Sequence, residues 1–547
     1  MTVLSRVLGL RPAHPCRMVI QRAVEVPMAD GVVLLADRYH PRDRPDAPLV
    51  LIRSPYGRGS ANDLAAGLIV ERGYQVLLQS LRGTGGSGGN FDGFTMHQPD
   101  GPSTVDWLRR QTWFPGMFAT WGASYLGYAQ WELAATPVPE WKAAVIQDAP
   151  SEFYHGFMYP GGAFALGNAL AWVQLTETMF DSGGSLWRQL AGQLTGGRVL
   201  ARAVDALPVR EADHAVAGRR VRHFQQWITH ETFDEYWAGM DHRANVANMP
   251  PLVHLSGGWH DFFLPGMLAD HAALRATGRR VRLLIGPWGH GKGSLTRHYL
   301  REALATLDTA FTGADHLPPA PVALHLGGAN RWVTHADWPP PHQPTTWYLH
   351  PHGGLRTEPA PESDPSTYHY DPADPTPSLG GTIVGLRPGP KDNRPLEARA
   401  DVLTFTGPPL TEDLTVAGPV TATLHVRSSN ACTDFSVRLC DVHPRGRSTN
   451  LCDGLLRLRP GDPAADEHGV RTVHIRLWPA GHVFRRGHRI RVQVASGAHP
   501  RHIRNPGTGE PLAETTTLRP AEQEILHDPG HPSAVVLPVA GGPDAQR

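Results

Sequence analysis

The stretch that most constrains the fold of this chain is residues 117–128, an apolar run that leads into a serine flanked by glycines. A nucleophile elbow of the Gly-x-Ser-x-Gly type uses small residues on both sides of a serine, so that the backbone can turn sharply from a strand into a helix. Gly122 and Gly127 are those residues here. Such a turn leaves the Ser124 hydroxyl exposed above a sheet, with the first amides of the next helix facing a developing oxyanion.

Charge and length limit the partners that the chain can have. Basic and acidic residues are equal in number, at 51 each, so no excess charge attracts nucleic acid or an anionic membrane. A small-molecule substrate is therefore the expected partner, and a homo-oligomer remains open.

The 547 residues indicate two to four domains. The apolar run at residues 7–10 is too short for a signal peptide core, and no segment is long enough to span a membrane. The expected location is the cytoplasm.

The four cysteines, Cys16, Cys432, Cys440 and Cys452, lack the close spacing of a zinc site. The sequence predicts no metal and no organic cofactor. Whether the last three cysteines form a disulfide is left open. The glycine-rich residues 82–89 lack the lysine and the helix start of a phosphate-binding loop, which argues against a nucleotide site.

Short apolar segments separated by helix-length stretches predict a parallel α/β sheet. A glycine turn joins the first two strands, and the candidate strands are residues 23–26, 32–39, 48–53, 74–78, 117–123, 143–147, 251–257 and 281–286. The aromatic-rich residues 151–240 interrupt this rhythm, and we interpret them as a helical cap over the edge of the sheet where ligands bind. The predicted substrate pocket comprises Phe153, Trp172, Trp259 and Phe262. The alternative is that the aromatic residues of the cap fill its own core.

The partners of Ser124 follow from the chemistry of a serine nucleophile. The hydroxyl needs a histidine as base, and the histidine needs a carboxylate to orient it and to stabilise the imidazolium. In an α/β-hydrolase both follow the serine in the chain, in loops after strands, with the acid first. Asp261 follows one predicted strand and a pair of glycines, and His290 follows another in a turn framed by glycine and proline. The predicted triad is therefore Ser124, Asp261 and His290.

These motifs resemble a known family. Residues 121–127, 258–261 and 286–290, in this order, look like the cocaine-esterase-like (CocE/NonD) hydrolases, which are related to the X-prolyl dipeptidyl peptidases. Residues 53–57 resemble the Arg-x-Pro-Tyr segment of the family, whose tyrosine hydroxyl helps to form the oxyanion hole. The resemblance assigns this role to Tyr56, with the backbone amide of Tyr125 as the second donor. Ser80 is a departure, because family members commonly carry an aspartate there.

The resemblance extends over nearly the whole chain and implies its domain organisation. The α/β-hydrolase core comprises residues 1–150 and 241–345, with the helical cap at residues 151–240 between its two parts. A connecting region at residues 346–402 leads to a C-terminal all-β module at residues 403–547, a β-sandwich of the jelly-roll type. Regular short strands after residue 403 are typical of such a sandwich. We interpret Asp434, Asp453 and Arg457 as structural, with sugar binding as the alternative.

The sequence thus predicts a serine hydrolase that cleaves carboxylic esters through an acyl-enzyme. One alternative keeps the same triad in an X-Pro dipeptidyl peptidase or an acylase of α-amino acid esters and amides. Such a site must hold a free α-ammonium group with acidic residues, for which Glu152, Glu177, Asp181 and Glu231 are candidates. An alternative of another class is a catalytically inactive protein that binds small molecules.

Overall fold

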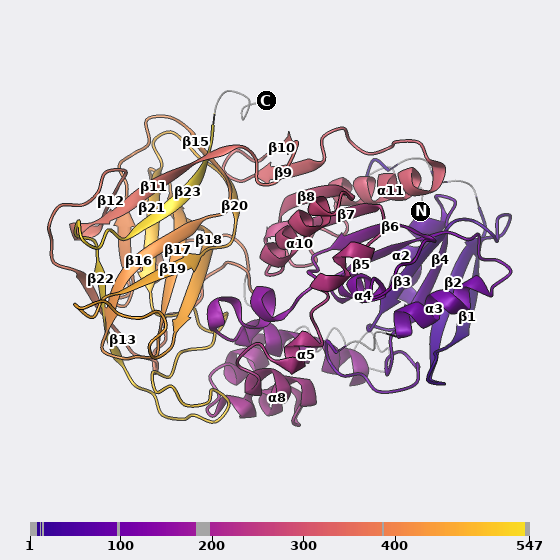
Figure 1. The fold of residues 1–547 in the computed structure, drawn as a ribbon, viewed down its shortest axis with the longest axis horizontal. Coiled ribbons are helices and arrows are strands. Elements are labelled where there is room, and N and C mark those ends of the chain that lie inside the picture. The colour runs from indigo at the N-terminus through magenta and orange to yellow at the C-terminus, as the bar shows by residue number, and fades with distance from the viewer. Residues whose placement is uncertain are drawn as a thin grey trace. The chain divides into compact units, whose positions relative to one another are not determined.

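The computed structural model describes residues 8–10, 13, 16–95, 99–181, 197–384 and 388–541. The chain forms two compact units, and each is assembled from segments far apart in the sequence (Figure 1). Unit 1 comprises Met1–Phe153, Glu235–Gly258 and Gly266–Ala323. Unit 2 comprises Tyr154–Asp234, Trp259–Pro265 and Leu324–Arg547. The domain boundaries expected from the sequence stay predictions.

Unit 1 is built on a sheet whose strands follow the order β1-β2-β4-β3-β5-β6-β7-β8. The central pairs β3 with β4, β3 with β5, β5 with β6, and β6 with β7 are parallel, while β1 and β2 join antiparallel at the edge. The predicted parallel sheet is therefore confirmed for these central strands. The strands are β1 (Met18–Pro27), β2 (Val33–Pro41), β3 (Leu49–Ser54), β4 (Gln75–Ser80), β5 (Phe118–Ala123), β6 (Trp141–Gln147), β7 (Leu252–His260) and β8 (Arg280–Gly289).

Helices cover both faces of this sheet. Successive side chains of a strand point to opposite faces. Thr120 of β5 bonds to Gln130 of α4, whereas the next residue, Trp121, packs edge-on against Tyr299 of α11. The helices α4 and α11 therefore lie on opposite faces. The helical elements of unit 1 are α2 (Ser60–Val70), α3 (Asp100–Arg109), α4 (Tyr125–Leu133), α9 (Glu235–Ala238), η4 (Arg243–Asn248), α10 (Leu264–Ala276) and α11 (Arg297–Thr312), where α10 begins in unit 2.

Two strands of the sheet run further than the sequence indicates. We expected strands over residues 251–257 and 281–286, each followed by a glycine turn, but β7 continues to His260 and β8 to Gly289. The glycines that were expected to form turns lie inside the strands. One of them is required there, because a Cβ on Gly258 would stand 2.1 Å from the carbonyl oxygen of Trp288. Glycine permits a close approach of two backbones there, and the prediction that the glycines form the turns was wrong. The turns begin further on, and His290 lies in one of them.

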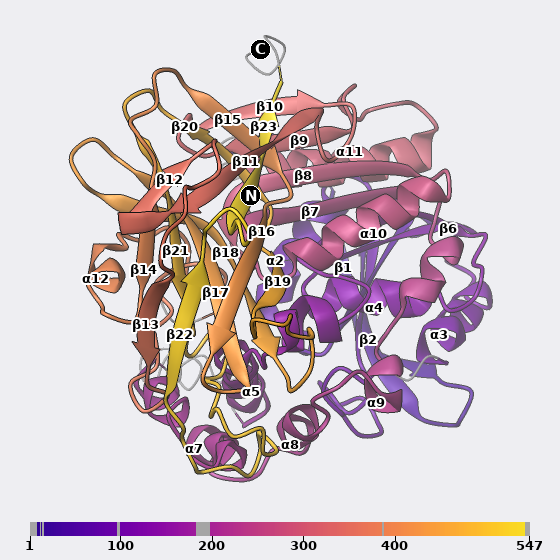
Figure 2. The same ribbon diagram turned by 60° about the vertical axis from the view of Figure 1, so that its left-hand side comes forward.

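Unit 2 contains a helical part and a large β part (Figure 2). The helical part lies within residues 154–234 and contacts the strands of the same unit, since a Cβ on Gly161 would overlap the carbonyl oxygen of Leu455. Its elements are η1 (Tyr154–Met158), η2 (Pro160–Gly162), α5 (Leu166–Asp181), η3 (Val209–Glu211), α7 (Ala212–Ala217) and α8 (Arg222–Thr229).

The β part of unit 2 follows the strand order β13-β22-β16-β23-β11-β12-β14-β21-β17-β18, with β15 and β20 paired to each other and β19 paired to β16. The neighbouring strands are mostly antiparallel, and the C-terminal part of the chain is therefore mostly β, as predicted. Its jelly-roll topology stays a prediction. The strands β9 (Val322–Leu326, which begins in unit 1) and β10 (Arg331–His335) are not part of this sheet. The elements of the β part are β11 (His342–His350), η5 (Pro351–Gly353), β12 (Gly354–Arg356), β13 (Ser366–Tyr370), α12 (Arg394–Glu397), β14 (Leu403–Thr406), β15 (Leu414–Gly418), β16 (Thr421–Ser428), β17 (Thr433–Val442), β18 (Ser448–Leu458), β19 (Arg471–Arg476), β20 (Ala480–Phe484), β21 (Arg489–Ala495), β22 (Ala521–Leu526) and β23 (Ala534–Ala540).

All four cysteines are free thiols, so the disulfide left open by the sequence does not form in this structure. Burial raises the pKa of the Cys440 thiol to about 12. Within the described part of the chain, no helix combines the length and the apolar character that crossing a membrane requires.

Candidate active site

Ser124 stands at a sharp turn between β5 and α4. Its backbone has a φ of +56°, a left-handed conformation that side-chain-bearing residues adopt rarely and at a cost. Its amide donates a hydrogen bond to the carbonyl oxygen of Gln147 at the end of β6, at 2.8 Å. The neighbouring strand thus holds the strained turn, as a nucleophile elbow requires.

The two flanking glycines are required by contacts rather than by their own φ angles. A Cβ on Gly122 would lie 2.4 Å from the backbone of Leu126 in the first turn of α4. A Cβ on Gly127 would lie 2.6 Å from Cβ of Ala149, next to β6. The second glycine stands three residues after the serine because that position of α4 approaches β6. The motif here is therefore Gly-x-Ser-x-x-Gly.

His290 directly follows β8, and its Nε2 lies 2.9 Å from the Oγ of Ser124. The two residues are 166 positions apart in the chain, and the sheet brings them together at one edge. The hydroxyl donates to Nε2 when the ring proton is on Nδ1, the arrangement in which the imidazole can accept the serine proton. The structure thus brings together the two side chains that the sequence predicts as nucleophile and base, and their catalytic roles stay a prediction.

Asp261 directly follows β7, as predicted, and belongs to unit 2. Its side chain is fully buried, and its Oδ1 accepts a hydrogen bond from the amide of Phe263 at 2.7 Å. Its carbonyl oxygen accepts a second one from Nε1 of Trp478 at 3.1 Å. These contacts fix Asp261 in its own unit, and its role as the acid of the triad stays a prediction.

The two predicted oxyanion donors both lie in unit 1. Tyr56 is half-buried two residues after β3, the strand next to β5, and its amide donates to Oγ of Ser54 at 3.1 Å. Because parallel strands end at the same edge of a sheet, Tyr56 and Ser124 follow neighbouring strand ends. Tyr125 supplies the first helical amide of α4, at the positive end of the helix dipole, while its phenol donates to the carbonyl oxygen of Gly93 at 2.7 Å. The oxyanion role of both residues stays a prediction.

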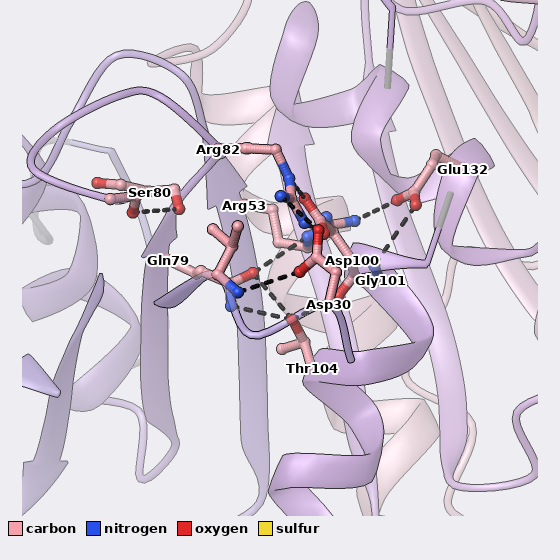
Figure 3. Close-up of polar contacts among 11 residues, drawn as sticks. Asp30, Arg53, Gln79, Ser80, Arg82, Asp100, Gly101, Thr104 and Glu132 are labelled. Atoms are coloured by element: carbon pink, nitrogen blue, oxygen red, sulfur yellow. Dashed lines mark hydrogen bonds and ion pairs between the residues drawn. The ribbon is translucent and has the colours of Figure 1, made fainter. Parts of the chain in front are cut away.

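A buried polar network connects β3, the strand that precedes Tyr56, to α4, the helix that follows Ser124 (Figure 3). Arg53, at the end of β3, forms a fully buried ion pair with Glu132 of α4. Its Nε donates to Gln79 of β4 at 3.2 Å. Burial raises the pKa of Glu132 to about 7, although Arg53 opposes this shift. The network joins the strands and the helix next to Tyr56 and Ser124. Polar residues at the ends of apolar strands were the only sign of it in the sequence.

Ser80, the departure from the family pattern, lies at the end of β4 in the same part of unit 1. Its Oγ accepts a hydrogen bond from Nη1 of Arg58 at 2.7 Å, and Arg58 also binds a carboxylate oxygen of Asp37 at 3.0 Å. A Cβ on Gly85 would stand 2.4 Å from the same Oγ. The glycine-rich loop at residues 82–89 therefore packs closely against Ser80, and it has no room for a side chain at Gly85.

The residues of the predicted substrate pocket have packing partners in their own units. Phe153 is buried in unit 1, with its ring centroid 4.3 Å from that of Phe94. In unit 2, Trp259 donates to the carbonyl oxygen of His325 at 2.6 Å, Phe262 stacks on Phe157, and Trp172 packs beside Trp227. Their role in binding a substrate stays a prediction.

A cavity of about 180 Å³ adjoins the elbow inside unit 1, and none of the four predicted pocket residues lines it. It lies between the sheet and the helices α2 and α11, and its walls are almost entirely apolar. Gln147 is one of the few polar residues in its lining. The lining includes Ile52, Leu78, Trp121, Ala123, Leu126, Gln147, Leu300 and Leu304. The sequence carried no signal for this cavity, because its walls come from strands and helices far apart in the chain.

Two family models match successive parts of the chain. Residues 30–292 match the X-Pro dipeptidyl-peptidase (S15 family), and residues 312–536 match the X-Pro dipeptidyl-peptidase C-terminal non-catalytic domain. The chain therefore combines an α/β-hydrolase-type domain, which the S15 family model matches, with a mostly-β C-terminal domain.

Whole-chain relatives narrow the class. The chain is 33% identical over 569 aligned residues to the cocaine esterase of Rhodococcus sp. (strain MB1 Bresler), covering 94% of this chain and 98% of that protein. It belongs to the cocaine-esterase-like (CocE/NonD) hydrolase family, as the sequence motifs indicated.

Two solved structures share the fold over nearly the full length. An α-amino acid ester hydrolase superposes with a TM-score of 0.79 at 23% identity, covering 96% of this chain and 97% of its own. An aminopeptidase from a marine sediment archaeon, Thaumarchaeota archaeon, superposes with a TM-score of 0.80 at 24% identity and the same coverage. At these identities the likeness concerns the fold alone.

Proposed function

We propose that this chain is a serine esterase that hydrolyses carboxylic esters of small molecules through an acyl-enzyme. The observation that carries the proposal is the 2.9 Å contact between Ser124 Oγ and His290 Nε2 at a strained turn after β5. A serine so placed needs only a base and an oxyanion site to attack an acyl carbon.

The mechanism assigns one task to each residue. The Oγ of Ser124 attacks the ester carbonyl while His290 accepts its proton, and the imidazolium then protonates the departing alcohol. Asp261 orients His290, and the Tyr56 hydroxyl and the Tyr125 amide donate hydrogen bonds to the oxyanion. Water, deprotonated by the same histidine, releases the acid and restores the serine.

The acidic residues of the helical segment favour an ester over a substrate with a free α-ammonium group. Both carboxylate oxygens of Glu177 bind the guanidinium of Arg219, at 2.8 and 2.7 Å. Glu231 accepts a hydrogen bond from the amide of Leu512 at 2.6 Å. Glu152 is buried in unit 1, and the side chain of Asp181 lies outside the described residues. Two of the four candidates are thus engaged in contacts of their own.

The test compares p-nitrophenyl butyrate with Ala-Pro p-nitroanilide, using the native chain and the Ser124→Ala variant. We expect turnover of the ester alone, and a loss of roughly 10⁶-fold in kcat without the nucleophile. Ser256→Ala is the matched control, because that buried hydroxyl has no hydrogen-bond partner among the described residues. Anilide cleavage that depends on Ser124 would transfer the assignment to the dipeptidyl peptidase. Ester turnover that survives in Ser124→Ala would rule out the proposed nucleophile.

A further inference from the structure

The strand next to the nucleophile ends in a second carboxylate. Asp148 directly follows β6, and the residue before it, Gln147, accepts the hydrogen bond from the amide of Ser124. Asp148 is not among the predicted site residues, although it resembles Asp261 in being an acid that comes after a buried apolar strand.

The backbone of Asp148 is strained in the same way as that of Ser124. Its φ is +48°, and its amide donates to the carbonyl oxygen of Ser256 in β7 at 2.8 Å. Aspartate reaches the left-handed region more readily than most residues but still at a cost. Two strained positions at the ends of adjacent central strands indicate that the geometry here serves chemistry, because packing alone would favour glycine.

The side chain of Asp148 is buried and is directed at the His290 loop. Its Oδ2 accepts a hydrogen bond from the amide of Gly291 at 3.0 Å, and a carboxylate oxygen lies within 4.8 Å of a ring nitrogen of His290. An opposite charge at 4 to 6 Å strongly favours the charged form of a titratable group. The carboxylate therefore lies close enough to stabilise an imidazolium.

We propose that Asp148 is a positioning residue for His290, which holds the histidine loop through Gly291 and stabilises the imidazolium by its charge. When Ser124 attacks, its proton moves to Nε2 of His290, and Asp148 remains ionised throughout. The inference rests on the proposed function and gives the histidine two acids with separate tasks. Asp261 orients the ring, and Asp148 supplies charge and fixes the loop.

Other groups near the histidine limit what a pH profile reports. In unit 1 these are Ser124, the exposed Lys292 of the same loop, and Tyr299 of α11, whose pKa is raised by burial and by the charge of Asp148. The proposed mechanism adds Asp261 to these groups near the histidine. Neither Tyr299 nor Lys292 changes in the variants below, so a shifted profile reports the loss of the Asp148 charge.

The test uses Asp148→Asn, because asparagine tolerates the left-handed backbone and its amide oxygen can still accept the Gly291 hydrogen bond. We expect kcat for p-nitrophenyl butyrate to fall by about 10- to 100-fold with little change in KM. The acid limb of the pH profile of kcat/KM should move to lower pH by about one unit, since a nearby opposite charge shifts a titration by this order. Asp308→Asn, which removes a carboxylate that binds Tyr74 in the same unit, should leave both quantities unchanged.

A second variant separates charge from structure. Asp148→Gly removes both the charge and the loop contact while permitting the positive φ, and it carries the test if the asparagine variant does not fold. An acid limb that moves equally in both variants supports the proposal. An unmoved limb and a native kcat in Asp148→Asn, with only Asp148→Gly impaired, would reduce Asp148 to a structural contact and overturn it.

The failure of this inference can be told apart from the failure of the proposed function. A fluorophosphonate probe phosphonylates an activated serine with loss of fluoride, so it reports the nucleophile without any knowledge of the substrate. If the probe labels the native chain but not Ser124→Ala, the nucleophile is established. The labelling rate of Asp148→Asn across pH then tests Asp148 alone, and a rate profile identical to that of the native chain contradicts the inference.

Discussion

Unit 1 and unit 2 each bury arginine and acidic side chains, but the two groups differ in their surroundings. In unit 2, Arg438 and Asp453 face each other across β17 and β18, and so do Asp434 and Arg457. In unit 1, the Arg53 and Glu132 pair joins the end of a strand to a helix, next to a serine with a strained backbone. Pairs directly opposite in a ladder stabilise a sheet, which is the structural role expected for them.

The comparison shows that buried charge alone does not mark a catalytic site. Asp453 binds two guanidinium groups, those of Arg438 and Arg501, and these partners hold its pKa well below the usual range in spite of burial. The atoms proposed to react in unit 1, Ser124 Oγ and His290 Nε2, lie 2.9 Å apart at a strained turn. A serine with a strained backbone in contact with an imidazole occurs in unit 1, whereas buried ion pairs occur in both units.

Breaking one buried pair in each unit should give the largest effects. Removing one partner of a buried pair leaves an uncompensated charge, so Glu132→Ala and Asp453→Ala should each lower the free energy of unfolding by about 3 to 5 kcal/mol. Urea denaturation followed by tryptophan fluorescence measures both. The remaining folded Glu132→Ala protein should also lose kcat, because α4 carries the Tyr125 amide, and the Asp453→Ala protein should not.

An apolar replacement of the whole pair provides the control. Replacing Arg53 with Met and Glu132 with Leu removes both charges, and such exchanges are often neutral or stabilising. The double variant should recover most of the stability that Glu132→Ala loses. Equal loss of kcat in Glu132→Ala and Asp453→Ala would contradict the distinction between the two units.

One tyrosine in each unit tests the difference between the two units by the loss of a single hydroxyl. Tyr56→Phe should lower kcat by about 10²- to 10³-fold, because removing one oxyanion donor raises the barrier by roughly 3 to 4 kcal/mol. Tyr368 of unit 2 shares a hydrogen bond with Ser496 at 2.8 Å, and Tyr368→Phe should cost about 1 kcal/mol of stability without changing kcat. Steady-state kinetics and thermal unfolding of both variants decide the matter, and an unchanged kcat in Tyr56→Phe would remove Tyr56 from the oxyanion site.

Much of unit 1 could be predicted because its strands are short, apolar and regularly spaced. The serine and histidine were identified from the residues that follow strands, since parallel strands end at the same edge and bring distant positions together. The strand ends themselves were misjudged at β7 and β8, where glycines read as turns. Local sequence cannot show that Gly258 packs against the backbone of Trp288, a contact between residues 30 positions apart.

The contacts that the sequence did not predict depend on side chains from several strands at once. Asp148 becomes significant only when the histidine loop lies beside it, and Glu132 only when Arg53 reaches α4. The same holds for the cavity beside the elbow. Apolar periodicity describes which face of an element is buried, but it contains no information about which polar groups meet there.

The smallest expected effect is a difference in how the two units respond to pH. Burial raises the pKa of Asp270 in α10 to about 7, although Ser151 opposes the shift with two hydrogen bonds. The folded state therefore retains this proton at pH values where the unfolded chain has lost it. The stability from Asp270 is fully present below the unfolded pKa near 4 and is lost as the pH rises through about 7.

The pKa shift of Asp441 in unit 2 has the opposite sign to that of Asp270. Burial acts to raise its pKa, but hydrogen bonds from His482 and His488 prevail and lower it. The contribution of Asp441 to stability is present above the pKa of the unfolded state and is lost as the pH falls through the lower pKa of the folded state. Asp270→Asn should therefore gain about 2 to 3 kcal/mol relative to the native chain between pH 5 and pH 8, since the native chain loses about 1.4 kcal/mol for each pH unit between pH 5 and the folded pKa of about 7. Asp441→Asn should keep a constant deficit over that range and lose the deficit only in acid. Urea midpoints at pH 4, 5, 6.5 and 8 separate the two, and parallel curves for Asp270→Asn and the native chain would show that Asp270 is ionised in the folded state.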